Sequence, residues 1–189
     1  MAIGDDGNPM TVVVGHPRPG SRTHAVAVRA GDLLATRLRA GAAKPPPRPH
    51  LVDLALLAPF LLDGRTAGRA FEAMGPNRVV VMASPTFRGA YSGLLKVFLD
   101  LLPRHGLSGS VVVPLMTAGI PEHRHVVDTT LRPVLAELGA DVPTPGISVL
   151  ETDIGRVDEV FEAWWDANGR ALRRAVGAAL ALREEATRC

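Results

Sequence analysis

The sequence predicts an α/β protein in which a single parallel sheet lies between two layers of helices. Five short runs rich in apolar and β-branched residues alternate with segments whose apolar residues recur at helical spacing, the pattern of a three-layer α/β sandwich. The run at residues 10–14 is nearly continuous in apolar residues, as expected for a strand buried on both faces. Two strands lead into loops rich in Gly, Pro and small polar residues, which is how an open sheet builds a ligand site at the carboxyl ends of its strands.

The elements follow one another along the chain in regular alternation. Strands are expected at residues 10–14, 50–54, 78–83, 110–116 and 146–150. Helices are expected at residues 23–39, 66–74, 94–102, 122–138 and 157–183. Thr23 is a candidate cap for the first helix, and Pro133 predicts a kink or a restart within the fourth. Residues 56–62 are expected to form a covered loop or a short helix, and the proline-rich residues 44–49 a stiff connector.

Composition and charge exclude several classes of protein. The chain has 189 residues, 47% of them hydrophobic, and no apolar run approaches the roughly 18 residues that a membrane span needs. Its 21 Lys and Arg are nearly matched by 19 Asp and Glu, so no nucleic-acid-binding surface is indicated. Residues 1–10 are expected to be a flexible tail without the character of a secretory signal, and residues 11–189 a single domain. The sole cysteine, Cys189, favours a cytoplasmic protein.

The first loop, residues 15–23, has the features of an anion site. It ends at a helix N-terminus, where free N–H groups and the helix dipole favour negative charge. Ser21 and Thr23 add hydroxyl donors, and Arg18 or Arg22 can neutralise a phosphate. An ordinary strand-to-helix turn with a capping Thr is the alternative. Phosphate binding is favoured because donors, arginines and helix start coincide.

Four other kinds of site are not supported. Gly15 and Gly20 have the spacing of a nucleotide-triphosphate loop, but Ser21 stands at the lysine position and two prolines remove N–H donors. The dinucleotide pattern G-x-G-x-x-G is also missing from this loop. No G-x-S-x-G motif surrounds any serine, so no catalytic residue is assigned. His123 and His125 are two residues apart and point to different faces of a helix, so no metal ligand is assigned either.

The two loops resemble those of the NADPH-dependent FMN reductases of the flavodoxin-like fold. The similarity is carried by residues 15–18 (GHPR), 21–23 (SRT), 84–96 (SPTFRGAYSGLLK) and 99–103 (LDLLP), with weaker matches at residues 114–119 and 131–135. It covers most of residues 11–150 and is strongest for flavin reductases that supply two-component monooxygenases. The resemblance implies a flavodoxin-like three-layer sandwich with a five-stranded parallel sheet in the order 2-1-3-4-5. It also implies an FMN at the switch point of that sheet.

The resemblance also assigns the residues expected to bind the cofactor. Those expected at the phosphate end are Arg18, Ser21, Arg22, Thr23 and Ser92, the last reaching either the phosphate or the ribityl chain. Those expected to border the isoalloxazine ring are Pro85, Thr86, Phe87, Arg88 and Gly89 on one edge and Thr117, Ala118 and Gly119 on the other. The family tends towards Tyr and Lys at the positions of Phe87 and Arg88. Residues 120–123 (IPEH) depart further from its pattern, at the edge expected to face the nicotinamide.

The implied activity is hydride transfer from NADPH or NADH to FMN, which needs stacking and alignment more than an acid or a base. NAD(P)H and the acceptor are expected to use the same flavin face in turn, or reduced FMN itself departs to a partner monooxygenase. A homodimer or homotetramer is expected, and part of the largely core-forming face around Trp164 and Trp165 is a candidate interface. The alternatives are a quinone or azo-type reductase with fixed FMN, and a non-enzymatic FMN-binding or electron-carrier protein.

Overall fold

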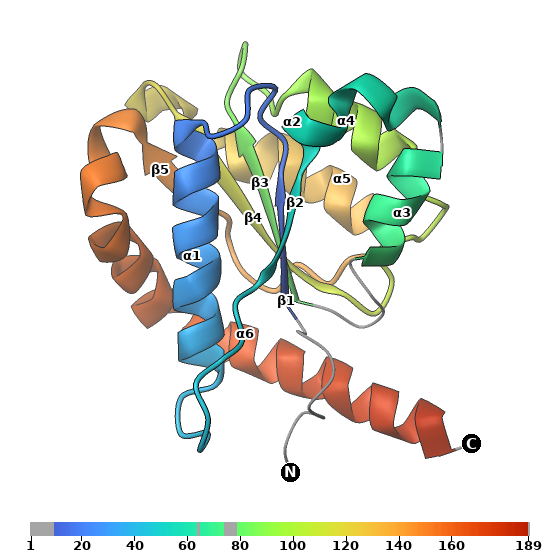
Figure 1. The fold of residues 1–189 in the computed structure, drawn as a ribbon. Helices are drawn as coiled ribbons and strands as arrows, with labels where there is room; N and C mark the ends of the chain where they lie inside the picture. The colour runs from blue at the N-terminus through green and yellow to red at the C-terminus, as the bar shows by residue number, and fades with distance from the viewer. Residues whose placement is uncertain (1–9, 64, 74–78, 189) are drawn as a thin grey trace.

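A computed structural model describes residues 10–63, 65–73 and 79–188, and within them the predicted sheet is confirmed (Figure 1). Its strands are β1 (Met10–Val14), β2 (His50–Asp53), β3 (Val79–Pro85), β4 (Val111–Ala118) and β5 (Ile147–Leu150). All pairs are parallel, and the strand order is β2-β1-β3-β4-β5. Of the expected N-terminal tail, residues 1–9 lie outside the described residues, and Met10 already belongs to β1 and is buried.

Helices cover both faces of the sheet. On one face, α1 (Arg22–Leu38) lies beside α6 (Val157–Arg188), as Figure 1 shows. The opposite face is covered by shorter elements: α2 (Leu54–Leu57), a 3-10 segment (Ala58–Asp63), α3 (Arg65–Ala73), α4 (Gly93–Asp100), a π-helical segment (Val127–Leu131) and α5 (Arg132–Glu137). Because side chains alternate along a strand, each strand contributes to both cores. Val12 and Val81 pack toward α1 and α6, whereas Val13 and Met82 pack toward the other layer.

The strand ends differ from the prediction at the edge where the loops begin. β3 continues to Pro85 and β4 to Ala118, although a loop was expected from Ser84 and from Thr117. The ladder explains the extension, because Thr117 pairs with both Pro85 and Val149 and so remains within the sheet. Residues that were expected to sit on flexible loops are therefore fixed by strand pairing.

The helices also required correction. Ser21, rather than Thr23, caps α1. Residues 54–63 are helical, which confirms the short-helix alternative for residues 56–62. The expected helix at residues 122–138 is wrong as a single element: a 3-10 turn (Pro121–His123) is followed by the π-helical segment, and α5 starts with Pro133 in its first turn. This agrees with the predicted restart at Pro133. α6 extends to Arg188, beyond the predicted end at residue 183. The predicted helix end at Met74 and strand start at Arg78 lie outside the described residues.

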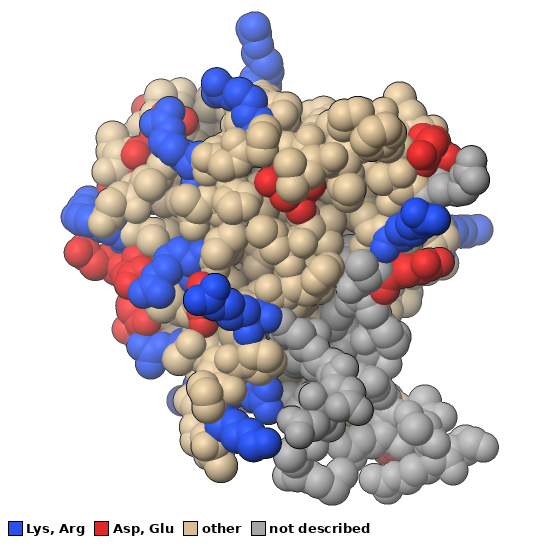
Figure 2. Space-filling model, viewed as in Figure 1, with Lys and Arg blue, Asp and Glu red and all other residues tan. Residues whose placement is uncertain are grey.

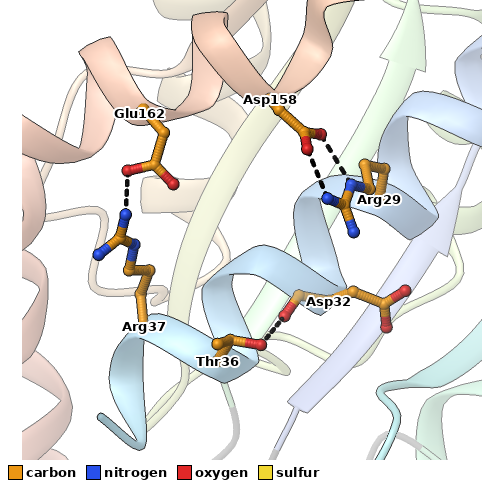
Figure 3. Close-up of polar contacts among 6 residues, drawn as sticks. All are labelled: Arg29, Asp32, Thr36, Arg37, Asp158 and Glu162. Carbon is orange, nitrogen blue, oxygen red and sulfur yellow. Dashed lines mark hydrogen bonds and ion pairs between the residues drawn. The ribbon is translucent and has the colours of Figure 1, made fainter.

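Ion pairs join the two long helices on one face. In Figure 3, Arg29 and Arg37 of α1 point toward Asp158 and Glu162 of α6. Arg29 donates two hydrogen bonds to Asp158, at 2.7 and 2.5 Å, and these lower the pKa of that carboxyl group. Both pairs are exposed to solvent, so the contact between α1 and α6 depends mainly on apolar packing.

The tryptophans of α6 belong to that apolar packing. Trp165 is buried and stacks on Phe161, with 6.1 Å between ring centroids. The Trp164 indole N–H donates to the Pro145 carbonyl at 2.9 Å. These contacts explain why this face forms core. Within the described residues, no helix combines the length and apolar character needed to cross a bilayer.

Candidate functional site

A cleft of about 330 Å³ opens at the carboxyl ends of the central strands. It is lined by residues 16 and 18–23 after β1, residues 85–87 at the end of β3, Thr117 and Gly119 at the end of β4, and Glu151 after β5. Its volume is within the ~300–1,000 Å³ typical of small-molecule and cofactor sites. Four chain segments that are distant in the sequence thus meet at one place, as expected at the switch point of a parallel sheet.

The start of α1 offers unpaired donors to this cleft. Ser21 caps the helix with extended backbone (φ −68°, ψ 165°), and its Oγ accepts a hydrogen bond from the His24 N–H at 3.1 Å. The N–H groups of Arg22 and Thr23 have no acceptor within the described part of the chain. A helix N-terminus with free N–H groups attracts an anion. The Arg18 and Arg22 side chains line the same cleft.

Thr23 joins this helix start to the end of β4. Its hydroxyl shares a hydrogen bond with that of Thr117, with 2.7 Å between the Oγ1 atoms, and both side chains are almost fully buried. Only one of the two hydroxyl hydrogens lies between the oxygens, so the other is left for a further acceptor. The pair fixes the position of the helix start relative to the sheet.

His16 was missed by the sequence analysis and lies in the wall of the cleft. Its ring is 6% exposed and packs edge-on against Phe87, with 5.7 Å between centroids. Its Nδ1 lies 3.0 Å from the Arg18 backbone nitrogen and 3.1 Å from the Arg18 carbonyl oxygen, so it accepts from the N–H in one tautomer and donates to the carbonyl in the other. Burial, as the main cause, lowers the pKa of His16 below its usual 6.5. His16 therefore folds the first loop back on itself as an uncharged ring.

Glu151 was also missed, and it brings negative charge to the cleft. Its Oε2 lies 3.0 Å from Nη1 of Arg22, and both side chains are largely open to solvent. A signal was present in the sequence, since Glu151 directly follows the fifth predicted strand at the carboxyl edge of the sheet. Its partner could not be read from the sequence, because the pairing depends on how β5 sits relative to α1.

The second loop forms a tight hairpin beside the cleft. Phe87 and Ala90 exchange backbone hydrogen bonds of 2.8 and 3.1 Å, and the residues between them both have positive φ, 54° at Arg88 and 74° at Gly89. This is the two-residue turn with left-handed central residues, which glycine adopts without strain. The turn holds Phe87 at the cleft but places Arg88 and Gly89 outside its lining. Whether these two residues border the ligand stays a prediction.

Ser92 and Ala118 also lie away from the cleft. Ala118 is buried in the sheet. The Ser92 hydroxyl donates to the Gly15 carbonyl and accepts from the Leu95 N–H at 3.1 Å, while its own N–H donates to Ser84 Oγ at 2.9 Å. With its single hydroxyl hydrogen engaged, Ser92 caps α4 and ties the two loops together. These bonds place Ser92 between the two loops, and its contact with a phosphate or ribityl chain stays a prediction.

Gly15 allows the two loops to approach this closely. Its N–H donates to the Ala83 carbonyl at 2.8 Å, and a Cβ atom at this position would lie 2.6 Å from Leu95 Cβ. Any side chain would push β1 away from α4. Glycine is thus required by the packing of this position against Leu95 of α4.

The remaining predicted residues do meet at one site, and the site fits a phosphorylated aromatic ligand. They are Arg18, Ser21, Arg22, Thr23, Pro85, Thr86, Phe87, Thr117 and Gly119. Thr86 donates its N–H to the Thr117 carbonyl at 2.7 Å, but its Oγ1 is buried without a partner among the described residues. A bound ligand is one way to satisfy such an atom. The described residues contain no cluster of three or more His, Cys, Asp or Glu suited to a metal ion.

The fold and this cleft define a flavodoxin-like α/β protein with unpaired N–H groups at the start of its first helix. Residues 9–154 match the family model of the NADPH-dependent FMN reductases. The chain belongs to this family, which confirms the resemblance read from the loops.

Individual relatives agree with this assignment. The chain is 35% identical over 102 residues to an FMN reductase (NADPH) of Escherichia coli K12, an alignment that covers 47% of this chain and 53% of the relative. It thus spans about half the length of the curated relatives it matches. Among solved structures it is similar to an NADH:FMN oxidoreductase in its apo form (26% identity, TM-score 0.65, 90% and 87% of the two chains). An oxidoreductase of Corynebacterium diphtheriae gives 25% identity and a TM-score of 0.68 over 93% and 97%.

Proposed function

We propose that this protein is an NAD(P)H-dependent FMN reductase whose cleft binds FMN with its phosphate at the start of α1. The observation that carries the proposal is the coincidence, in one cleft, of the unpaired Arg22 and Thr23 N–H groups, the Ser21 hydroxyl and the Arg18 guanidinium. Family membership supports it, and so do the names of the relatives, in which FMN is the common term. Those names divide between NADPH and NADH, so the proposal includes both donors.

The residues of the chain would act by binding and alignment. Bound FMN supplies the chemistry of hydride acceptance from a reduced nicotinamide. The helix start and Arg18 would hold the phosphate, while Phe87 and the chain around Thr86 would border the ring. Phe87 is 44% exposed, so this part of the wall remains accessible to a second molecule. Hydride transfer depends chiefly on orienting two rings, and it requires no acid or base among these side chains.

Flavin binding is the first test. FMN and riboflavin are titrated into purified protein while flavin fluorescence is followed, with wild type compared with Arg18→Gln and, as a matched control, Arg170→Gln on the exposed side of α6. We expect wild type to bind FMN more tightly than riboflavin, and Arg18→Gln to weaken FMN binding roughly tenfold through loss of a charge-assisted contact. Arg170→Gln should behave as wild type. Equal binding of both flavins would contradict a phosphate site at α1.

Turnover is the second test. Oxidation of NADPH and of NADH is followed separately with FMN, FAD and a quinone as acceptors. Oxidation with FMN supports the proposal, and parallel lines at varied donor and acceptor support use of the same site in turn. Preference for the quinone as acceptor, with FMN retained on the protein, would favour the quinone-reductase alternative. Flavin binding without oxidation by any acceptor would favour an electron carrier.

We further propose that the chain forms a homodimer or homotetramer, and that reduced flavin passes to a partner monooxygenase in the cytoplasm. The resemblance and the cysteine content support these proposals. For the oligomer, an exposed apolar surface on α2 and the 3-10 segment after it adds support, with Leu56, Phe60 and Leu62 each more than 60% exposed. Figure 2 shows a broad uncharged area on the face where these elements lie in Figure 1. Sedimentation of the wild type and of Phe60→Asp tests whether this apolar surface holds the oligomer together.

A further inference from the structure

Glu151 stands apart from the other described residues that line the cleft, because it is the acidic one among them. It follows the last residue of β5 and begins the 3-10 segment Glu151–Arg156. Its Oε2 is 3.0 Å from Nη1 of Arg22, the first residue of α1. The Glu151 carboxylate therefore pairs with the guanidinium of Arg22, whose backbone N–H is one of the two unpaired groups.

The charges in the cleft make this pairing significant for an anion. Arg18 and Arg22 bring two positive charges, and Glu151 cancels one of them. A phosphate monoester carries about −1.5 to −2 charges near neutral pH. A phosphate at the start of α1 would meet a nearby carboxylate and would have to share Arg22 with it or displace it. The side chains of Arg22 and Glu151 are 68% and 45% exposed, so the pair can open without leaving a buried charge.

A purely structural role for Glu151 has less support, because Asp153 already anchors the 3-10 segment Glu151–Arg156. Asp153 is only 14% exposed and pairs with Arg124 at 3.1 Å and with Arg156 at 3.0 Å. Arg124 follows the 3-10 turn after β4, so these contacts hold the chain after β5 to the neighbouring loop. Loss of the Glu151 carboxylate leaves them in place.

We infer that Glu151 sets the affinity and specificity of the phosphate end of the cleft by competing with the ligand's phosphate for Arg22. The inference rests on the proposed function, which it deepens. With Glu151 present, the affinity for FMN is lower than the helix start and the two arginines alone would give. The ratio of the affinities for FMN and riboflavin is smaller for the same reason. A cleft of this kind suits a flavin that is released between turnovers.

The test compares Glu151→Gln with Glu137→Gln, which removes the same charge from an exposed position at the end of α5. Dissociation constants for FMN and riboflavin are measured by flavin fluorescence at low salt. We expect Glu151→Gln to lower the dissociation constant for FMN about three- to tenfold and leave that for riboflavin unchanged. Glu137→Gln should change neither. The gain should shrink at high salt and disappear when Arg22→Gln is combined with Glu151→Gln.

Each other outcome is decisive. Unchanged FMN affinity in Glu151→Gln, with wild type binding FMN, overturns the inference and leaves the proposed function standing. Weaker binding of both flavins would identify Glu151 as a direct acceptor for the ligand and also overturns it. If only the variant binds FMN, the competition is supported while the proposed function of the wild type fails. If neither protein binds FMN, both are overturned.

Discussion

The two strand-to-helix junctions of this protein begin alike and end differently. Each runs from a buried strand through a loop to a serine that caps the next helix, Ser21 for α1 and Ser92 for α4. At the first junction the following N–H groups stay unpaired and border the cleft. At the second, the serine is buried and bonded to Gly15 of the first loop. The same capping residue therefore borders an open cleft in one place and attaches loop to loop in the other, and what separates them is contact with a neighbouring segment.

Removing the Ser92 hydroxyl should have the largest effect on stability. Ser92→Ala leaves the Gly15 carbonyl and the Leu95 N–H without their partner in a buried region. We expect the free energy of unfolding to fall by about 3 kcal/mol. Urea unfolding measures it. A loss no larger than that of Ser21→Ala would show that the two caps are equivalent and would remove the contrast.

The second test adds a methyl group where the junctions touch. In Gly15→Ala, the new Cβ would lie 2.6 Å from Leu95 Cβ, so β1 and α4 must shift. We expect a loss of about 2 kcal/mol, as for overpacked cores. Gly93→Ala at the start of α4 is the control, because a Cβ there meets nothing within 4 Å and should change stability by less than about 0.5 kcal/mol.

Ser21→Ala tests the open junction. Loss of a partly buried cap should lower the free energy of unfolding by about 1 kcal/mol. If the hydroxyl also meets the phosphate, the dissociation constant for FMN should rise roughly fivefold, with riboflavin unaffected. Ser92→Ala, studied below its unfolding transition, should retain FMN affinity. The reverse ranking of the two variants in FMN binding would restore the original prediction for Ser92.

The buried His16 predicts a pH dependence confined to the first junction. Its pKa is lowered in the folded state, so between the folded value and 6.5 the unfolded chain binds more protons. The contribution to stability is complete above pH 6.5 and is lost as the pH falls toward the folded pKa. Urea unfolding of wild type and His16→Asn on both sides of pH 6.5 should show a steeper acid loss in wild type. Parallel pH profiles would contradict it.

The smallest effect is expected at the hairpin of the second junction. Arg88 has φ 54°, a region that Asn tolerates better than other residues with a Cβ, and Asn-Gly is the preferred pair for this turn. Arg88→Asn should raise the free energy of unfolding by about 0.5 kcal/mol. Because Arg88 lies outside the cleft lining, FMN affinity should not change. A marked loss of affinity would return Arg88 to the binding site.

The sequence was sufficient for the sheet and for most of the cleft, because both depend on local signals. The strand order followed from the resemblance, and β-branched runs with adjacent loops located the carboxyl edge. The contacts that the sequence did not reveal have a different origin. The sequence does not show that Gly15 lies against the Ser92 hydroxyl, or that β5 brings Glu151 to Arg22. Pairings between segments distant in the chain, and the burial they produce, are not encoded in the spacing of either segment alone.

The bond between Ser92 and Gly15 has a consequence for the lifetime of a complex. It joins the two loops behind the cleft in the absence of any ligand, so this contact does not have to be ordered on binding. The adjustable part of the site is then its rim, where the exposed Arg18, Arg22 and Glu151 side chains lie. Differences in affinity among variants of one site arise mostly from the dissociation rate. Under the proposed function, how long a flavin stays would be set by these three charges at the rim.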